Sequence, residues 1–207
     1  MADKDKFLDL WQRIDAKGDG SPVFQKLKEL YSEPRRKYHN ANHIHFCLDQ
    51  FEYVRHLPND PEAVEMAIWF HDAVYDPKSS NNEICSAKFA LNILRLGELH
   101  DAFNMKVSVL IMYTRHLRPP RDIDAQVLVD IDLSSLGKPW EGFIIDSQRV
   151  REEYSHIPDK DFRIGRGMFF QKLLMRPTVY LTQYFHRKYE AQARENLERW
   201  IREFGSP

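Results

Sequence analysis

The sequence predicts an all-α fold, a single-domain bundle of about ten helices. Apolar residues recur with the 3.6-residue period of amphipathic helices, runs of alternating β-branched residues are few, and helix start signals recur along the chain. With 207 residues the chain is long enough to form one sizeable hydrophobic core. We therefore expect one domain over residues 1–207, with three parts.

The first part, residues 1–34, is predicted to be a helical pair that braces the core. Its first helix, Lys6–Ile14, has an apolar face, and the KGDG turn ends it. Ser21 and Pro22 then offer a cap and a first-turn proline for a second helix over Val23–Tyr31.

The second part, residues 35–137, is predicted to hold the core. One helix is expected from about Asn42 to His56, and Asp60-Pro61 begins a helix that is apolar on nearly every side up to Val74. Ser80-x-x-Glu83 has the spacing of a capping box for the next helix. The expected helices that complete this part are Ile84–Leu96, which Gly97 ends, Met105–His116, and Ala125–Leu136, which Asp122 or Asp124 begins.

The third part, residues 138–207, is predicted to be three charged amphipathic helices that pack around the core. They follow the break Gly137-Lys138-Pro139 and cover Trp140–Ile157, Asp161–Met175 and Thr182–Phe204. Their Arg- and Glu-rich faces are typical of a solvated surface or of a homodimer contact.

The charge balance excludes two classes of partner. Thirty basic residues against 31 acidic ones leave no strong field for a nucleic-acid polymer or a membrane surface. The charged start MADKDKFLDL differs from a signal peptide, and no apolar run could span a bilayer, so we expect a cytoplasmic protein. Cys47 and Cys85 are expected to be reduced.

The apolar helix Pro61–Val74 carries His71 and Asp72 near its end. An unpaired carboxylate in apolar surroundings costs several kcal/mol or becomes protonated. A metal ion would compensate this charge, and its remaining ligands would have to come from other helices. His71 and Asp72 therefore predict a metal site.

Helical spacing selects further inward-facing candidates. His43 lies beside the apolar stripe of its helix, with His39 one turn earlier, whereas His45 faces the other way. In the segment DIDLSSLG, Asp132 shares a face with apolar residues, so we expect Asp132 to be buried and Asp130 to lie on the polar face. The predicted metal ligands are His43, His71, Asp72 and Asp132.

The order His43, then His71-Asp72, then Asp132 resembles the H…HD…D pattern of the HD-domain superfamily of metal-dependent phosphohydrolases. Further strings resemble a less studied branch whose members are predicted phosphohydrolases: RKYHNANHI, FHDAVYDP, NNE..SA, TRH, DIDLSSLG, REEY, GR and E..AR.NL. The resemblance covers roughly Arg35 to Leu197 and implies an all-helical core of the HD-domain type.

Imidazole and carboxylate ligands suit Mn, Mg, Fe, Co, Ni or Zn, and ligand type alone does not choose among them. Such an ion activates water and polarises a phosphoryl group, and fixed cations then stabilise the phosphate. Arg115 is the first candidate for that contact. The other cations near the predicted ligands in the sequence are Arg35, Arg36, Lys37, Lys78 and Arg149.

Several roles stay open between a catalytic and a structural reading. The resemblance implies an acidic residue that orients the attacking water, and either Asp76 or Glu83 could serve, although the capping box already accounts for Glu83. His116, which continues an apolar stripe, could bind a second metal, contact phosphate or be a core histidine. Asp132 could cap a helix, and His39 could support a ligand or cap a loop.

The first functional hypothesis is a phosphohydrolase that acts on a small phosphorylated molecule, for instance a nucleotide, through a metal-activated water. A di-iron oxygenase on the same scaffold is an alternative that needs more ligands, for which only His116 and Asp76 are available. A non-catalytic module that senses a metal or a nucleotide is the third hypothesis.

Overall fold

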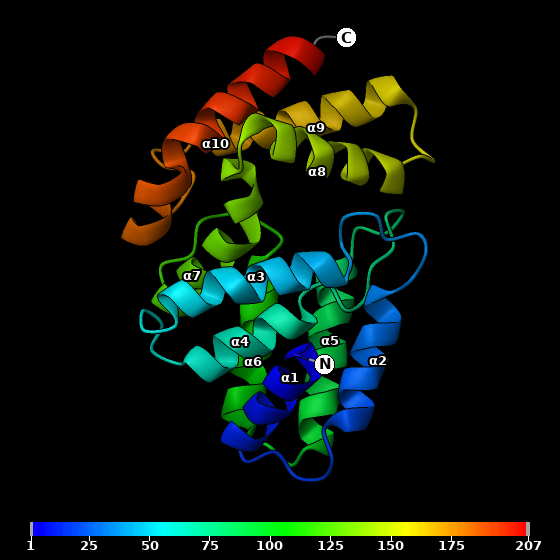
Figure 1. Ribbon diagram of the computed structural model, residues 1–207, viewed down its shortest axis with the longest axis vertical. Helices are drawn as coiled ribbons and strands as arrows, with labels where there is room; N and C mark the ends of the chain where they lie inside the picture. The colour runs from blue at the N-terminus through cyan, green and yellow to red at the C-terminus, as the bar shows by residue number, and fades with distance from the viewer. Residues whose placement is uncertain (1, 206–207) are drawn as a thin grey trace. The chain divides into compact units, whose positions relative to one another are not determined.

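A computed structural model describes residues 2–205, and the described chain is all-helical, as predicted (Figure 1). Helices lie close to most of the positions that periodicity predicts. They are α1 (Ala2–Arg13), α2 (Ser21–Tyr31), α3 (Ala41–Val54), α4 (Pro61–Phe70), α5 (Asn82–Leu96), α6 (Asp101–Tyr113), α7 (Ile123–Leu133), the short 3₁₀ helix η1 (Ser134–Gly137), α8 (Trp140–Glu153), α9 (Asp159–Leu174) and α10 (Gln183–Phe204). Among the described helices, none is long and apolar enough to cross a membrane.

The chain divides into two compact units, Met1–Val129 and Asp130–Pro207. The boundary lies inside α7, eight residues before the break at Lys138 from which the C-terminal helices were expected to start. That the two units form one domain stays a prediction.

Helix α4 is the centre of the first unit. Every residue from Ala63 to Phe70 is buried, because α4 packs against α1, α3, α5 and α6. Its start is the predicted one: Asp60 accepts a hydrogen bond from the Ala63 amide, and Pro61 occupies the first turn. The nearly all-apolar pattern after Glu65 therefore correctly predicted a helix enclosed on all sides, but this helix ends at Phe70 and not at Val74, so His71 and Asp72 lie just beyond it.

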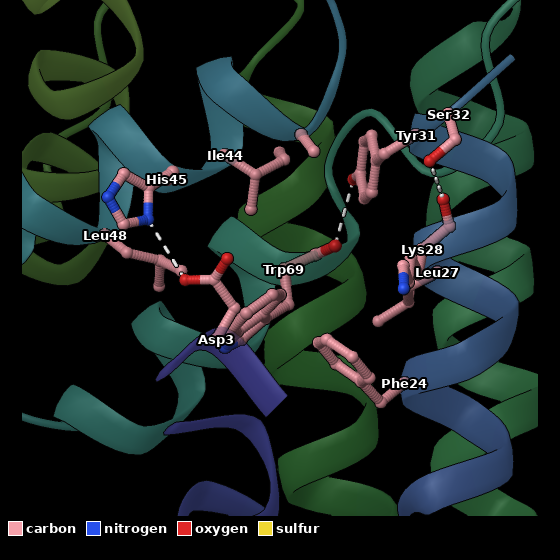
Figure 2. A pocket seen from close by; sticks show the side chains of 11 residues that line it. Asp3, Phe24, Leu27, Lys28, Tyr31, Ser32, Ile44, His45, Leu48 and Trp69 are labelled. Carbon is pink, nitrogen blue, oxygen red and sulfur yellow. Dashed lines mark hydrogen bonds and ion pairs between the residues drawn. The ribbon is translucent and has the colours of Figure 1, made fainter. Parts of the chain in front are cut away.

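Polar contacts tie the neighbouring helices to α4. The buried Glu65 carboxylate accepts from Arg13 at the end of α1 and from Arg55 at the end of α3, both at 2.7 Å. Glu62 binds the same two arginines. The hydroxyl of Tyr31 donates to the Trp69 carbonyl at 2.9 Å and so joins α2 to α4 (Figure 2).

Several predicted helix ends differ from the structure, among them the start of α5 and the end of α6. Helix α5 begins at Asn82 with Asn81 as its cap residue, so Ser80 and Glu83 form no capping box. The physical reason is the Asn82 side chain, which bonds both backbone groups of Asp76 and draws the loop back before the helix begins. Helix α6 ends at Tyr113, and His116 lies in a turn with φ of 51°, so it does not continue the apolar stripe.

In the second unit, two buried carboxylates hold the segment that enters α10. Glu190 accepts the amides of Val179 and Tyr180, and Asp130 accepts those of Leu181 and Thr182 together with the Thr182 hydroxyl. Gly137 lies against Tyr189 so closely that an added Cβ would come within 2.5 Å of the Tyr189 Cβ. Much of DIDLSSLG and E..AR.NL therefore serves to hold α7, η1 and α10 together.

Candidate metal centre

His71 is placed by the end of α4. It is the C-cap residue, its amide donates to the Ala67 carbonyl, and its side chain is 2 % exposed. The ring Nδ1 lies 2.9 Å from the Ile68 carbonyl oxygen, which can only accept, so Nδ1 carries the proton. In the neutral ring, the lone pair is then on Nε2, and a metal ligand must offer such a lone pair.

His43 comes from the first turn of α3. Asn40 caps this helix by accepting the Asn42 amide, and its own side-chain amide donates to the Lys37 carbonyl. His43 is buried, and its Nε2 lies 3.2 Å from Nε2 of His71. His45, two residues later, is exposed and pairs with Asp3, as its predicted outward direction requires.

Asp72 completes this arrangement within the first unit. Its Oδ2 lies 3.2 Å from His71 Nε2 and 3.6 Å from His43 Nε2, and its side chain is 13 % exposed. Burial alone raises the pKa of Asp72, but His71, His39 and His43, when protonated, hold this pKa well below its usual range through their positive charge. The carboxylate is therefore ionised at neutral pH.

These separations fit one divalent ion. Ligand atoms about 2.1 Å from a metal are about 3.0 Å apart at neighbouring octahedral positions and about 3.4 Å apart in a tetrahedron. The three observed separations of 3.2, 3.2 and 3.6 Å lie close to both values. Two imidazoles and a carboxylate are also a donor set that borderline and hard divalent ions accept.

Asp132 lies in the last turn of α7, in the second unit. His43, His71 and Asp132 are a group of residues that could hold a metal ion. The predicted burial was wrong: Asp132 is half-buried and Asp130 is fully buried. The cause is the set of Leu181 and Thr182 donors on Asp130, which lie 51 and 52 residues away in the sequence.

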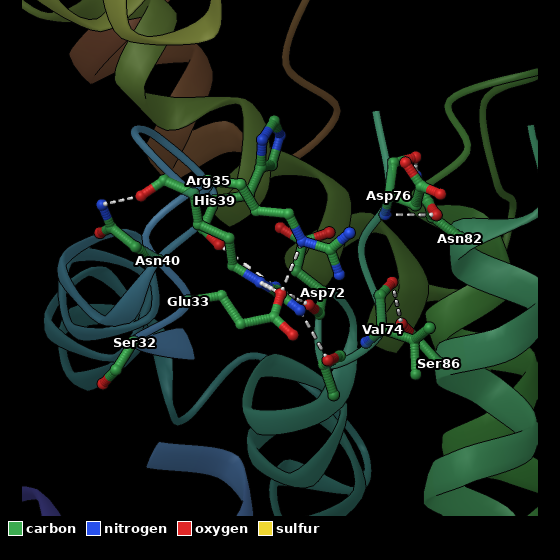
Figure 3. A network of polar contacts seen from close by, with 12 residues as sticks. Ser32, Glu33, Arg35, His39, Asn40, Asp72, Val74, Asp76, Asn82 and Ser86 are labelled. Atoms are coloured by element: carbon green, nitrogen blue, oxygen red, sulfur yellow. Dashed lines mark hydrogen bonds and ion pairs between the residues drawn. The ribbon is translucent and has the colours of Figure 1, made fainter. Parts of the chain in front are cut away.

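Arg36 supports the backbone around the pair His71-Asp72. Its guanidinium, 1 % exposed, donates to the carbonyls of Asp72, Ala73 and His39 and pairs with Glu33 at 3.1 Å. Figure 3 shows Glu33, His39 and Asp72 gathered in this network. Arg36 was predicted to be a candidate phosphate contact, but its donors are occupied by backbone carbonyls. No local sequence signal could have revealed this, since the carbonyls lie 36 and 37 residues away.

Among the predicted catalytic residues, Asp76 is bonded within its own loop, whereas Glu83 and Arg115 pair with each other. Asp76 accepts the Lys78 amide in its own loop, where Asn82 also binds its backbone (Figure 3). Glu83 and Arg115 face each other across the α5–α6 pair, with Arg115 Nε 3.9 Å from Glu83 Oε2 and both side chains about one-third exposed. Ser86, one turn after Glu83, bonds Val74 and so ties α5 to the segment that follows Asp72.

Aromatic rings line the approach to His43. The ring of His39 stacks on Tyr75 at 4.2 Å between centroids, and Tyr38 lies 5.0 Å from His43. The sequence did not lead us to select these two tyrosines. The signal was nevertheless present, since Tyr38 directly precedes His39 and Tyr75 follows His71-Asp72 within one helical turn. The roles predicted for His39 and His116 stay predictions.

The chain matches no known family model, no curated protein and no solved structure.

Proposed function

We propose that this chain is a metal-dependent phosphohydrolase that acts on a small phosphorylated molecule, and that it belongs to the HD-domain superfamily, which it resembles. The observation that supports this most is the convergence of His43 Nε2, His71 Nε2 and Asp72 Oδ2 at separations of 3.2 to 3.6 Å. Asp132 is the proposed fourth ligand. A bound divalent ion would supply the charge that activates water and polarises a phosphoryl group.

The chain's own residues have distinct parts in this proposal. The Ile68 carbonyl holds His71 in the tautomer that presents a lone pair, and Arg36 fixes the backbone of Asp72. Arg115 is proposed to bind the substrate phosphate, because its loose 3.9 Å pairing with Glu83 lets the guanidinium turn to a stronger acceptor.

Glu83 is the better of the two candidates for orienting a water molecule. Its carboxylate has no helix-capping bond and is partly exposed, whereas the Asp76 carboxylate is already bonded within its loop. Once Arg115 turns to phosphate, Glu83 would be left with a free acceptor near the segment that follows Asp72.

The experiment is a phosphate-release assay on protein stripped with a chelator and reloaded separately with Mn, Mg, Fe, Co, Ni or Zn. Substrates are p-nitrophenyl phosphate and a panel of nucleoside mono-, di- and triphosphates. Asp72→Ala should lower phosphate release by about 100-fold or more and weaken metal binding, with an unchanged circular dichroism spectrum.

The matched control is Asp49→Ala, since Asp49 is a half-buried aspartate on α3 that pairs with Lys6 and His45. It should leave metal binding and turnover unchanged. Full activity in Asp72→Ala, or no metal binding in the wild type, would refute the proposal. Two equivalents of iron with oxygen consumption would support the oxygenase instead, and nucleotide binding without turnover would support the sensor.

A further inference from the structure

Helix α9 of the second unit presents an apolar stripe to solvent. Ile164, Met168 and Met175 are 40, 65 and 86 % exposed, and Met175 directly follows the last residue of the helix. At about 100° per residue, the three side chains lie within an arc of about 40° on one side of α9. Methionine is enriched at protein–protein interfaces, where its flexible side chain adapts to the opposing surface. This side of α9 is therefore typical of a contact surface.

Gly165 lies on the same side of α9, next to Ile164. A glycine inside a helix weakens the helix relative to alanine. Nothing within the described chain lies within 4 Å of the position where a Cβ atom would stand. The chain's own packing therefore gives no reason for a glycine here, whereas a second surface that approaches the helix backbone closely would give one.

The same face carries one unpaired charge of each sign. Asp161 and Lys172 are exposed, and neither has an ion-pair partner among the described residues. The nearby Asp159, by contrast, pairs with both Arg151 and Arg163. Since Asp161 and Lys172 are three helical turns apart, their side chains point in directions only about 20° apart but lie about 16 Å apart along the helix axis. They are too far apart to pair within one chain.

This face is complementary to itself when a second copy lies antiparallel to it. The midpoint between Asp161 and Lys172 is also the midpoint between Gly165 and Met168. A two-fold axis through this point places Asp161 beside Lys172 of the second copy, and it places Met168 over Gly165 of the second copy. Charge and shape then match in one and the same arrangement, which favours a second copy of this chain over an unrelated partner.

We propose that the exposed face of α9 is the contact surface of an antiparallel homodimer. The face is only one helix wide, so it buries less than the roughly 800 Å² per partner that is usual in stable complexes. The dimer is therefore weak and forms at high protein concentration. No residue of this face belongs to the candidate metal centre, so the dimer stands independently of the proposed phosphohydrolase.

The test is sedimentation equilibrium of the full chain from about 1 μM to about 1 mM, which gives the dissociation constant of the dimer. The wild type should pass from monomer to dimer over this range. Met168→Glu should weaken dimerisation by about tenfold or more, because it brings two carboxylates together near the two-fold axis. Gly165→Leu should also weaken it, although leucine favours a helix more than glycine does.

The matched control is Met105→Glu, because Met105 is a 50 % exposed methionine on α6 in the first unit. This variant should dimerise like the wild type. Circular dichroism checks that each variant is folded, which is expected because all the substituted residues are exposed.

An exchange of charges tests the antiparallel pairing. Asp161→Lys and Lys172→Asp should each weaken dimerisation by about threefold or more, because each brings like charges together. The double variant exchanges the two signs and should return the dissociation constant to within about twofold of the wild-type value. Only a contact that joins these two positions across the interface gives both losses and the recovery.

A wild type that stays monomeric at about 1 mM would overturn the proposal. So would a dimer that survives Met168→Glu, or one that Met105→Glu disrupts instead. A double variant that dimerises as poorly as the two single variants would show that Asp161 and Lys172 do not meet across a two-fold axis, and it would overturn the proposal as well.

Discussion

At the scale of single residues, Arg36 gives the clearest prediction. Arg36→Met keeps much of the side-chain volume but leaves the carbonyls of Asp72, Ala73 and His39 without their donor. We expect a loss of about 2–3 kcal/mol in the free energy of unfolding, measured by urea denaturation. Metal affinity, measured by calorimetry, should also fall, because Asp72 would no longer be held in position.

Arg35→Met is the control, since Arg35 is 52 % exposed and pairs only with Glu33 among the described residues. Its stability should change by less than about 0.5 kcal/mol. Arg36→Lys should recover part of the metal affinity. Equal effects of the two methionine variants would show that Arg36 does not position Asp72.

The sequence indicated which polar residues lie near the candidate site more reliably than it indicated which of them are buried. The pair His71-Asp72 was selected because both were expected near the end of an apolar helix, and their short separations from His43 agree with that reasoning. The order of burial of Asp130 and Asp132 was reversed, because helical periodicity describes one helix and its neighbours. The amides that bury Asp130 come from Leu181 and Thr182, which no local pattern indicates.

At the scale of helices, the Glu65 network predicts how α1, α3 and α4 stay together. Glu65→Gln keeps the shape but removes the charge that binds Arg13 and Arg55. Because Glu65 is buried and the arginines are about 30 % exposed, we expect a loss of about 1–3 kcal/mol. Thermal denaturation followed by circular dichroism measures it. Glu62→Gln, in a 33 % exposed pair, should cost less, and the reverse order would contradict this account.

Helix identity was predicted well where composition was extreme, and helix ends less well. Helix α4 is apolar at every position from Met66 to Phe70, which left no other interpretation. The end of α6 was missed because the residue with positive φ is His116, where glycine would have been the usual signal. The start of α5 was missed because Asn81, not Ser80, is its cap residue, while the Asn82 side chain bonds the backbone of Asp76 in the preceding loop.

At the scale of the whole molecule, the contacts of Glu190 lead us to expect that the free energy of unfolding falls at acidic pH. Burial raises the pKa of Glu190, but the Val179 and Tyr180 amides and Arg194 lower it more, so its pKa is below the usual value. A lowered carboxyl pKa contributes stability that is present above about pH 4.3 and is lost as the pH falls through the folded-state pKa. Glu190→Gln should therefore be less stable than the wild type at pH 7, by about 1–2 kcal/mol.

Urea denaturation at pH 7 and at pH 3 measures this difference, which should shrink at the lower pH. The control is Glu203→Gln, which removes one partner of an exposed pair with Arg199 in α10 and should behave alike at both pH values. A Glu190→Gln deficit that stays constant with pH would mean that the charge of Glu190 does not stabilise the fold.

The fold class of the molecule could be predicted from sequence, and the function only as a hypothesis. Periodicity and helix start signals are local, and nearly every expected helix is present. The site depends on atoms brought together from distant segments. The pair His71-Asp72 was the only part of it that a local sequence pattern could indicate. The role of Arg36 depends on hydrogen bonds to the backbone carbonyls of Asp72 and Ala73. Because every residue has a backbone carbonyl, the sequence does not show which of them an arginine will bind.

The enclosure of α4 has a consequence for how readily an ion could be captured. Amides of a helix covered on every side exchange with solvent only when most of the unit opens, so α4 should be among the slowest segments to exchange. His71 follows directly on a rigid element and would therefore lose little freedom on binding an ion. Preorganisation of this kind favours tight and fast coordination, without an ordering step after the ion arrives.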